Sequence, residues 1–207
     1  MPEPAAPPPM PPSHEFCSGR LALDFCNTVS TDGRDRLADP AGLSGWAERA
    51  GWPLTGTVGA AELAGFRSLR GRLRNLVAAA IDHRSPAPED IEALDGAMID
   101  AFSALRLAPG QDRPLAWQDA AQPADKLRHG IARDAVDLLT AGDPARLRRC
   151  AGEDCGWFFY DSSKNGTRRW CVMEDCGTRD KVRRFRARQA GSRQIGSPRA
   201  GSRQAGF

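Results

Sequence analysis

Four cysteines in the last third of this chain of 207 residues constrain its fold more than any other feature. Cys150 and Cys155 form one C-x4-C pair, and after an interval of fifteen residues Cys171 and Cys176 form a second pair with the same spacing. Two such pairs joined by one loop can place four sulfur atoms at the corners of a tetrahedron around Zn²⁺. The spacing therefore predicts one zinc ion, and four thiolate ligands leave no open coordination position, which is typical of a structural site.

Disulfide bonds and free thiols in a core are the two other interpretations that the sequence leaves open. The chain begins with a proline-rich stretch that lacks the basic start and apolar centre of a secretory signal, so we expect a cytoplasmic protein. In a reducing compartment, paired cysteines are more often metal ligands than disulfides. Cys17 and Cys26 have no matching pair, and we expect both to be buried as small apolar side chains.

The two parts of the chain carry opposite net charges. Residues 1–145 contain 14 Lys and Arg against 20 Asp and Glu, whereas residues 146–207 contain 15 against 6. The basic part is therefore expected to bind a polyanion, and a solvated basic tail is the alternative. No apolar run approaches the ~20 residues that a membrane span needs, so we expect no membrane partner.

Apolar periodicity predicts a mainly α fold. Helices are expected around residues 43–47, over 60–83, from Glu89 to a stop at Pro109-Gly110, and over 123–141. Residues 16–29 suit a strand or a helix, and one or two short strands are expected within 111–122. The stripe of the helix that opens at Glu89 is expected to face the core, and it consists of Ile91, Leu94, Met98, Ile99, Phe102 and Leu105. The basic face of the 60–83 helix is expected in solvent, and it consists of Arg67, Arg70, Arg72 and Arg74.

These signals divide the chain into four parts. Residues 1–13 are expected to form a disordered proline-rich arm, and residues 14–142 a helical domain with room for short strands. Residues 143–189 are expected to form a small four-cysteine zinc finger that ends in a basic helix. Residues 190–207 have too few apolar groups to fold and are expected to be a disordered basic tail.

The finger itself is expected to be treble-clef-like or ribbon-like. Residues 157–161 indicate a strand whose aromatic side chains pack around the metal loop, with stacking on nucleic acid bases as the alternative. Thr178 is a candidate N-cap for the final helix. Val182 and Phe185 lie three residues apart on that helix, and we expect them to face the core of the finger.

Basic side chains on this helix and just before it are the candidate DNA contacts, because a guanidinium group suits both phosphate and guanine edges. The candidates are Arg168, Arg169, Arg179, Lys181, Arg183, Arg184, Arg186 and Arg188.

The cysteine region resembles the CGNR zinc finger family. The resemblance rests on Cys150, on Cys155-Gly156-Trp157-Phe158-Phe159-Tyr160-Asp161, on Arg168-Arg169-Trp170-Cys171-Val172-Met173, and on Cys176-Gly177-Thr178-Arg179 with Lys181, Arg183 and Arg184. The segment Gly19-Arg20-Leu21-Ala22-Leu23-Asp24-Phe25-Cys26-Asn27-Thr28 is similar to the opening of the ABATE domain that usually precedes this finger. The third residue of the family's Cys-Gly-Asn-Arg motif is Thr178 here, and both residue types can cap a helix.

This resemblance implies a bacterial, stress-induced transcription regulator. In such proteins DNA binding is assigned to the finger, so the chain is expected to be cytoplasmic and associated with the nucleoid. The N-terminal domain would sense a small-molecule effector or mediate homodimer formation. Asp24, Asn27 and Thr28 are the candidate ligand-binding residues, although Asp24 and Asn27 also suit a purely local role that fixes a turn.

Two other classes of function remain open. A zinc finger that serves only as a scaffold for protein interaction is the main alternative to DNA binding. An enzyme is not expected, because the chain lacks a visible nucleophile–base pair, a phosphate-binding loop and an open metal site. His83 and His129 are the available acid–base groups, and solvated positions are expected for both.

Overall fold

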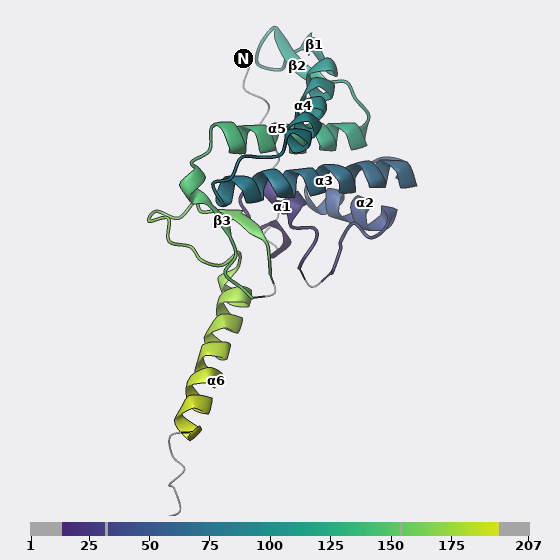
Figure 1. Cartoon of the computed structure of the whole chain (residues 1–207). Helices are drawn as coiled ribbons and strands as arrows, with labels where there is room; N and C mark the ends of the chain where they lie inside the picture. The colour runs from purple at the N-terminus through teal and green to yellow at the C-terminus, as the bar shows by residue number, and fades with distance from the viewer. Residues whose placement is uncertain (1–13, 32, 154, 195–207) are drawn as a thin grey trace, which may run out of the picture.

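The computed structural model describes residues 14–31, 33–153 and 155–194, and these residues form a mainly α protein (Figure 1). The helices of the larger region are η1 (His14–Phe16), α1 (Leu21–Cys26), α2 (Pro40–Arg49), α3 (Ala60–Ile81), α4 (Pro88–Ser103) and α5 (Pro123–Thr140), with the strands β1 (Leu105–Pro109) and β2 (Leu115–Asp119). The finger contains η2 (Pro144–Arg146), β3 (Leu147–Arg149), β4 (Phe158–Tyr160), the π-helical turn η3 (Met173–Gly177) and α6 (Thr178–Gln194). No helix in the described ranges is both long and apolar enough to cross a membrane.

The short helix α1 lies at the centre of the core, where every one of its side chains is buried. It packs against α3 and α5 and also against β4 of the finger. Its first turn is held by Asp134 of α5, which accepts a hydrogen bond of 2.8 Å from the main-chain N–H of Ala22. This carboxylate satisfies one of the N–H groups that a helix start leaves unpaired. Residues 21–26 are therefore helical, which resolves the ambiguity between helix and strand in the sequence.

Helix α3 confirms the predicted apolar stripe, with Leu63, Phe66, Leu73 and Val77 among its buried side chains. Its basic face is not simply solvated. Arg70 is buried and forms a two-pronged ion pair with Asp35, with N–O distances of 2.6 and 2.7 Å. The expectation of a solvated face is wrong at this position because Asp35 lies within reach, and a paired guanidinium can be buried.

The helix expected from Glu89 to Pro109 is shorter in the structure. Helix α4 ends at Ser103, and β1 then pairs with β2 in an antiparallel hairpin. The apolar spacing continues from Phe102 to Leu105, but from Leu105 onward the main chain pairs with β2 instead of forming a further helical turn. The side chains of Ile91, Ile99 and Phe102 are also exposed, so the expectation that the whole stripe faces the core is wrong.

The finger shares its core with the helical region. Leu147 of β3 and Phe158 of β4 belong to the same buried cluster as α1, α3 and α5. The N–H of Tyr160 donates a hydrogen bond of 2.9 Å to the carbonyl of Ser18, which lies just before α1. The strand predicted within 157–161 is present as β4. The two regions are therefore joined by a common apolar interior as well as by the chain.

Helix α6 leaves the body of the molecule and projects away from it (Figure 1). Asp180 is the buried residue of its first turn, whereas Val182 and Phe185 are 43% and 62% exposed. The prediction that Val182 and Phe185 face the finger core is wrong because that core is already filled by Trp157, Phe159 and Val172. The helix extends to Gln194, so it includes the first residues of the predicted tail. Residues 195–207 and the predicted arm at 1–13 lie outside the described residues.

Thr178 does not act as an N-cap. The π-helical turn η3 runs directly into α6, and the extended residue before the turn is Val172. Thr178 has helical backbone angles of −69° and −44°, and its hydroxyl donates a hydrogen bond of 3.3 Å back to the carbonyl of Met173. The helical segment thus begins one turn earlier than the sequence predicts.

Candidate metal centre and the attachment of the finger

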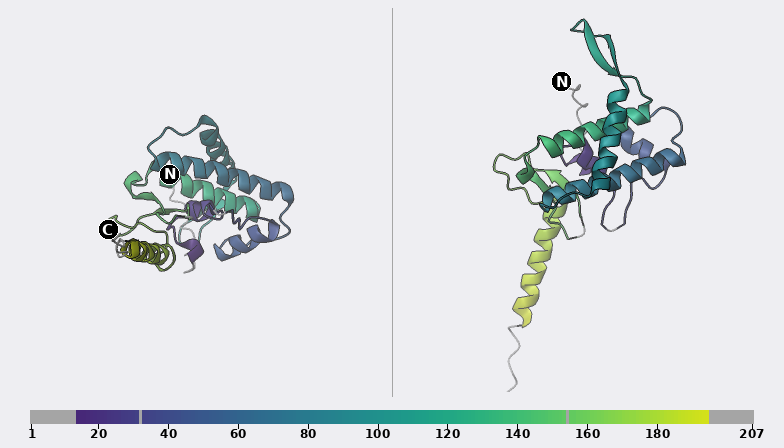
Figure 2. Two further views of the ribbon diagram at one scale, coloured as in Figure 1. Left: turned by 60° about the horizontal axis from the view of Figure 1, so that its bottom comes forward. Right: turned by 45° about the horizontal axis from the view of Figure 1, so that its top comes forward.

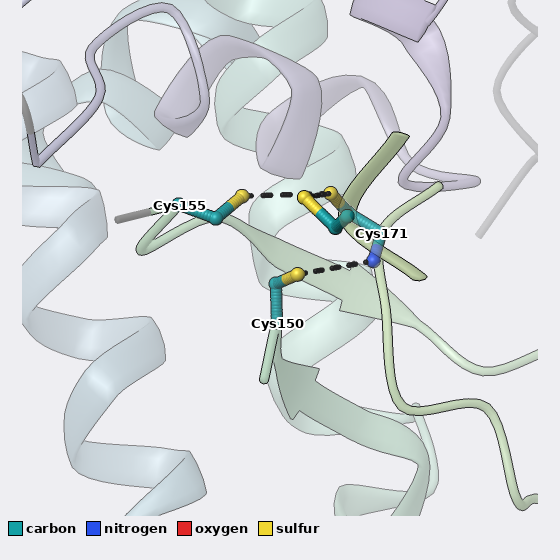
Figure 3. Close-up of side chains that lie close together, drawn as sticks. Cys150, Cys155 and Cys171 are labelled. Carbon is teal, nitrogen blue, oxygen red and sulfur yellow. Dashed lines mark hydrogen bonds between the residues drawn. The ribbon is translucent and has the colours of Figure 1, made fainter. Parts of the chain in front are cut away.

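The four predicted zinc ligands come together in one buried group. The sulfur atoms of Cys150, Cys155, Cys171 and Cys176 all lie within 4.8 Å of one another. The sulfurs of Cys155 and Cys171 are 3.5 Å apart (Figure 3), and those of Cys171 and Cys176 are 3.6 Å apart. A tetrahedron of zinc–sulfur bonds of about 2.3 Å has edges of about 3.8 Å, so the group has the size that Zn²⁺ requires. The four cysteines are free thiols and not disulfides.

Short main-chain elements position these side chains. Cys150 follows β3, and its N–H donates a hydrogen bond of 2.8 Å to Trp157, the residue that leads into β4. The second pair is delivered by the loop before η3 and by the turn itself, which contains Cys176. Gly152 lies within the first loop, where an added Cβ would come to 3.2 Å from the Cys176 sulfur. A side chain at this position would therefore crowd the Cys176 sulfur and the side chain of Cys155.

Three N–H donors point at the sulfurs. The main-chain N–H groups of Gly152 and Cys171 donate to the Cys150 sulfur at 3.4 and 3.3 Å, and Nη2 of Arg179 donates to the Cys176 sulfur at 3.3 Å. Four thiolates and one Zn²⁺ carry a net charge of about −2, and these donors offset part of it. The donor set is therefore that of a thiolate site rather than of an uncharged thiol cluster.

Four thiolates can lie this close together when a divalent cation offsets the repulsion between their negative charges. In the protein without a metal, hydrogen bonding with the Cys150 and Cys155 sulfurs raises the pKa of Cys171, and burial raises the pKa of Cys176. Zinc binding displaces these protons, because thiolate is the form that ligates metal. Four buried cysteines at this spacing form a site for one zinc ion, which would supply cross-links between the two loops and no open position for a substrate.

Arg168, a predicted DNA contact, lies largely inside the finger. Its guanidinium donates to the carbonyl oxygens of Trp170, Cys171 and Cys17, and it stacks at 4.5 Å from the centre of the Phe159 ring. These contacts join the segment before α1 to the second cysteine pair. The other predicted DNA contacts, from Arg169 through the basic residues of α6 to Arg188, are exposed.

Asn27 attaches the finger to the helical region. Its side-chain Nδ2 donates to the carbonyl of Phe158 and its Oδ1 accepts from the N–H of Phe158, both at 2.8 Å. The side-chain amide thus pairs with the main chain of β4 as a neighbouring strand would, and Asn27 and Phe158 are both buried. Thr28, the next residue, donates to the carbonyl of Phe25 and accepts from Arg70. The polar groups of both side chains are engaged inside the protein, and their role in ligand binding stays a prediction.

Asp24 has an unusual environment for a carboxylate. Its Oδ1 accepts a hydrogen bond of 3.0 Å from the N–H of Ser18, while its buried Oδ2 has no hydrogen-bond partner among the described residues. Burial, with smaller effects from the acidic groups of Asp134 and Glu15, raises the pKa of Asp24 from 3.8 to about 7. The folded protein therefore holds this proton more tightly than the unfolded chain does.

This shift predicts that Asp24 makes stability fall as pH rises. Because the folded pKa is the higher one, the stabilisation from protonated Asp24 is present at low pH and is lost as pH rises through about 7. The loss between pH 5 and pH 8 should be about 2 kcal/mol in the free energy of unfolding. The variant Asp24→Asn does not titrate and mimics the protonated form, so its advantage in stability over the wild type should be about 2 kcal/mol larger at pH 8 than at pH 5.

Urea unfolding of both proteins at the two pH values measures this difference. Comparing the variant with the wild type at each pH cancels the pH dependence of zinc binding, which both proteins share. An Asp24→Asn variant that differs from the wild type by the same amount at pH 5 and pH 8 would show that Asp24 does not titrate in this range.

His129 is buried, contrary to the expectation of a solvated side chain. Its Nδ1 lies 2.8 Å from Oδ2 of Asp119, which also pairs with Arg133 at 3.3 Å. These contacts fix the end of β2 to α5. His129 lies two residues from both Leu127 and Ile131, so helical periodicity places it off their apolar stripe, and the sequence gives no sign of its acidic partner. His83 is exposed, as expected.

Two family models match the chain. The ABATE model, described as "Putative stress-induced transcription regulator", matches residues 19–142, and the CGNR zinc finger model matches residues 146–189. Neither description is that of an enzyme. A comparison with curated proteins finds no match. The first match covers more than half of the chain and the second contains all four zinc ligands, so the protein belongs to the ABATE family and carries a CGNR zinc finger at its C-terminal side.

Proposed function

We propose that this protein is a DNA-binding transcription regulator whose finger contacts duplex DNA mainly through α6. The observation that carries this proposal is the shape and charge of that helix. It projects from the molecule, and it contains seven Arg and Lys against one Asp. A helix of 17 residues is about 25 Å long, and an α-helix of this kind fits the major groove of B-DNA.

Two groups of cations on α6 differ in what they contact. Arg183 and Arg184 both pair with the buried Asp180, at 2.6 and 2.9 Å, and Arg183 also contacts Glu153. Arg179 pairs with Asp175 at 3.0 Å. The pair of Arg179 with Asp175 is exposed on both sides and contributes little to stability, so a phosphate can replace Asp175 at small cost. The pairs with Asp180 orient these arginines at the base of the helix.

Lys181 and Arg186 have exposed side chains, and neither forms an ion pair with an acidic residue in the described part of the chain. We place them at the centre of the proposed contact surface, with Arg188 beyond them and the exposed Arg169 beside the metal loop. Arg168 is assigned a positioning role instead, because its guanidinium already serves three carbonyl groups within the protein. In this proposal the helical domain holds the finger, and hence α6, in a defined orientation through Asn27.

Charge reversal on α6 tests the proposal. The double variant Lys181→Glu/Arg186→Glu should bind a mixed-sequence duplex at least about tenfold more weakly at moderate salt, because two phosphate contacts become repulsive. The slope of log affinity against log salt should also fall by about 2. Fluorescence anisotropy with a labelled duplex measures both quantities.

The matched control is Arg113→Glu/Lys126→Glu, which changes the net charge by the same amount outside the finger. This control separates a local contact from the effect of net charge on any polyanion. The proposal fails if both double variants lose affinity equally, or if the α6 variant binds DNA as the wild type does with its zinc content unchanged.

Protein interaction through α6 is the second candidate function. Exposed Val182 and Phe185 lie at positions i and i+3, a spacing with which amphipathic helices enter an apolar groove. Under this alternative, a stoichiometric partner would be recovered from nuclease-treated lysate by the wild type and lost with Phe185→Ala. Under the DNA proposal, Phe185→Ala keeps most of its affinity for duplex DNA.

A further inference from the structure

Exposed apolar side chains are concentrated in one stretch of the chain. Of the nine large apolar residues that are exposed within the described ranges, six lie between residues 91 and 117. These six are Ile91, Ile99, Phe102, Leu107, Leu115 and Trp117, and each is 47–59% exposed. They come from α4 and from the β1–β2 hairpin that follows it directly. This surface lies outside the finger and has no part in the proposed DNA contact.

The hairpin has one apolar face. Its register sets Leu107 opposite Trp117 and Pro109 opposite Leu115, and directly opposed residues of an antiparallel pair lie on the same face. The other face pairs Ala108 with Ala116 and Arg106 with Gln118, which are small or polar. Side chains alternate between the two faces along a strand, so the alternating sequence places the large apolar side chains on one face of the hairpin.

Within the described part of the chain, the hydrogen bonds and ion pairs that tie the hairpin to the body of the protein lie at its base. The N–H of Ala120 donates a hydrogen bond of 3.0 Å to the carbonyl of Ala104, and Asp119 is held by His129 and Arg133. Beyond these contacts the hairpin projects past α4 and α5 (Figure 2). A two-stranded hairpin alone in water is only marginally stable, and a third element that covers its apolar face stabilises it.

We propose that the apolar face of the hairpin, extended by Ile99 and Phe102 of α4, binds the same face of a second copy of this chain. A two-fold axis through the hairpins would bring Leu107 and Trp117 of the two copies together, as an isologous interface requires. The five large side chains of this surface, each about half exposed, offer roughly 400–600 Å² per copy. That area lies in the upper part of the range for the largest apolar patch of a monomer, and it is about two thirds of the ~800 Å² per partner that a standard stable complex buries.

The charges around this surface favour a second copy over a polyanion. Helix α4 contains five acidic residues and no basic one, so nucleic acid and anionic membranes are repelled. The hairpin strands and their turn, residues 105–119, carry two basic and two acidic residues and are neutral overall. In a symmetric pair, the exposed acids Glu92, Asp95 and Asp100 of the two copies lie at the rim, where salt reduces their mutual repulsion. Association should therefore become stronger as salt is raised, which is opposite to the salt dependence of DNA binding.

The proposed interface leaves the finger accessible. The hairpin and α6 lie at opposite ends of the molecule in Figure 1 and in the right-hand view of Figure 2. A dimer joined at the hairpins would thus present two α6 helices. The inference does not depend on DNA binding, because self-association is measured without DNA, and either proposal can fail while the other holds.

Sedimentation velocity of the zinc-loaded full chain over a concentration series tests this inference. The wild type should sediment as a dimer at about 100 µM, and Leu107→Glu and Trp117→Glu should each shift it to a monomer or weaken association by at least about tenfold. Gln118→Glu adds the same charge on the other face of β2, and Val182→Glu adds it at an equally exposed apolar site on α6. Both controls should remain dimeric.

Zinc content and far-UV circular dichroism establish that each variant is folded. A wild type that stays monomeric at the highest concentration overturns the inference. So does a dimer that survives both hairpin substitutions, or one that Val182→Glu disrupts, because the contact would then lie elsewhere. A dimer that weakens as salt is raised would also contradict it.

Discussion

Replacing Cys171 with serine is expected to unfold the finger from about residue 150 onward. Serine has nearly the same size, but its hydroxyl does not ionise to a zinc ligand, so the two loops lose their cross-link. Structural zinc contributes about 10–16 kcal/mol of apparent binding free energy in small fingers, which is as large as the whole stability of an ordinary domain. Among the described residues, the apolar cluster of the finger contains seven buried side chains, four of which are the cysteines themselves. It cannot replace the metal.

Near-UV circular dichroism reports this change through Trp157 and Trp170, which pack in or against that cluster. Limited trypsin digestion reports it through cleavage at the arginines of the finger. Cys17→Ser is the matched control, because Cys17 packs against the same cluster but lies outside the four-sulfur group. The control should keep one zinc ion and its tryptophan spectrum. A Cys171→Ser protein with full zinc content and an unchanged spectrum would refute the assignment of Cys171 as a ligand.

Removing the Asn27 side chain is expected to have the second-largest effect. In Asn27→Ala the N–H and the carbonyl of Phe158 lose their partners within a buried site, and each unsatisfied group costs about 1–3 kcal/mol. We expect the free energy of unfolding to fall by about 2–5 kcal/mol. The amide of Phe158 should also exchange with solvent faster, because its hydrogen bond joins the finger to the helical region.

Urea denaturation of the zinc-loaded protein measures the first effect, and hydrogen exchange measures the second. Asn75→Ala is the control, since Asn75 is an exposed asparagine whose side chain makes a single longer contact of 3.3 Å with Asp90. It should change the free energy of unfolding by no more than about 0.5 kcal/mol. If Asn27→Ala is no less stable than this control, Asn27 does not hold the finger in place.

The zinc site was predictable from sequence because a metal selects residue types at short, fixed spacing. Cys150 and Cys155, and likewise Cys171 and Cys176, are close in the chain, and the two loops needed only one connection to meet. The stripe of α3 was predictable for a similar reason, since its periodicity depends on neighbours three and four residues away. Local rules account for both.

Long-range partners were not predictable in this way. Asn27 was recognised as a polar residue of a motif, but its partner Phe158 is 131 residues away, and nothing local indicates that a side-chain amide completes β4. The guanidinium of Arg168 donates to the carbonyl of Cys17, which is 151 residues away in the chain. The exposure of Phe185 depends on how completely other residues fill the finger core. Each of these features is decided by tertiary packing, which overrides the local pattern.

The central claim is that one zinc ion, held by four cysteines, builds the finger that presents α6. X-ray absorption at the zinc edge, combined with elemental analysis of protein purified without chelator, tests it most directly. The account predicts one zinc ion per chain with four sulfur neighbours at about 2.3 Å and no nitrogen or oxygen in the first shell. A metal-free protein with an intact finger, or a zinc ion with fewer than four sulfur ligands, would contradict it.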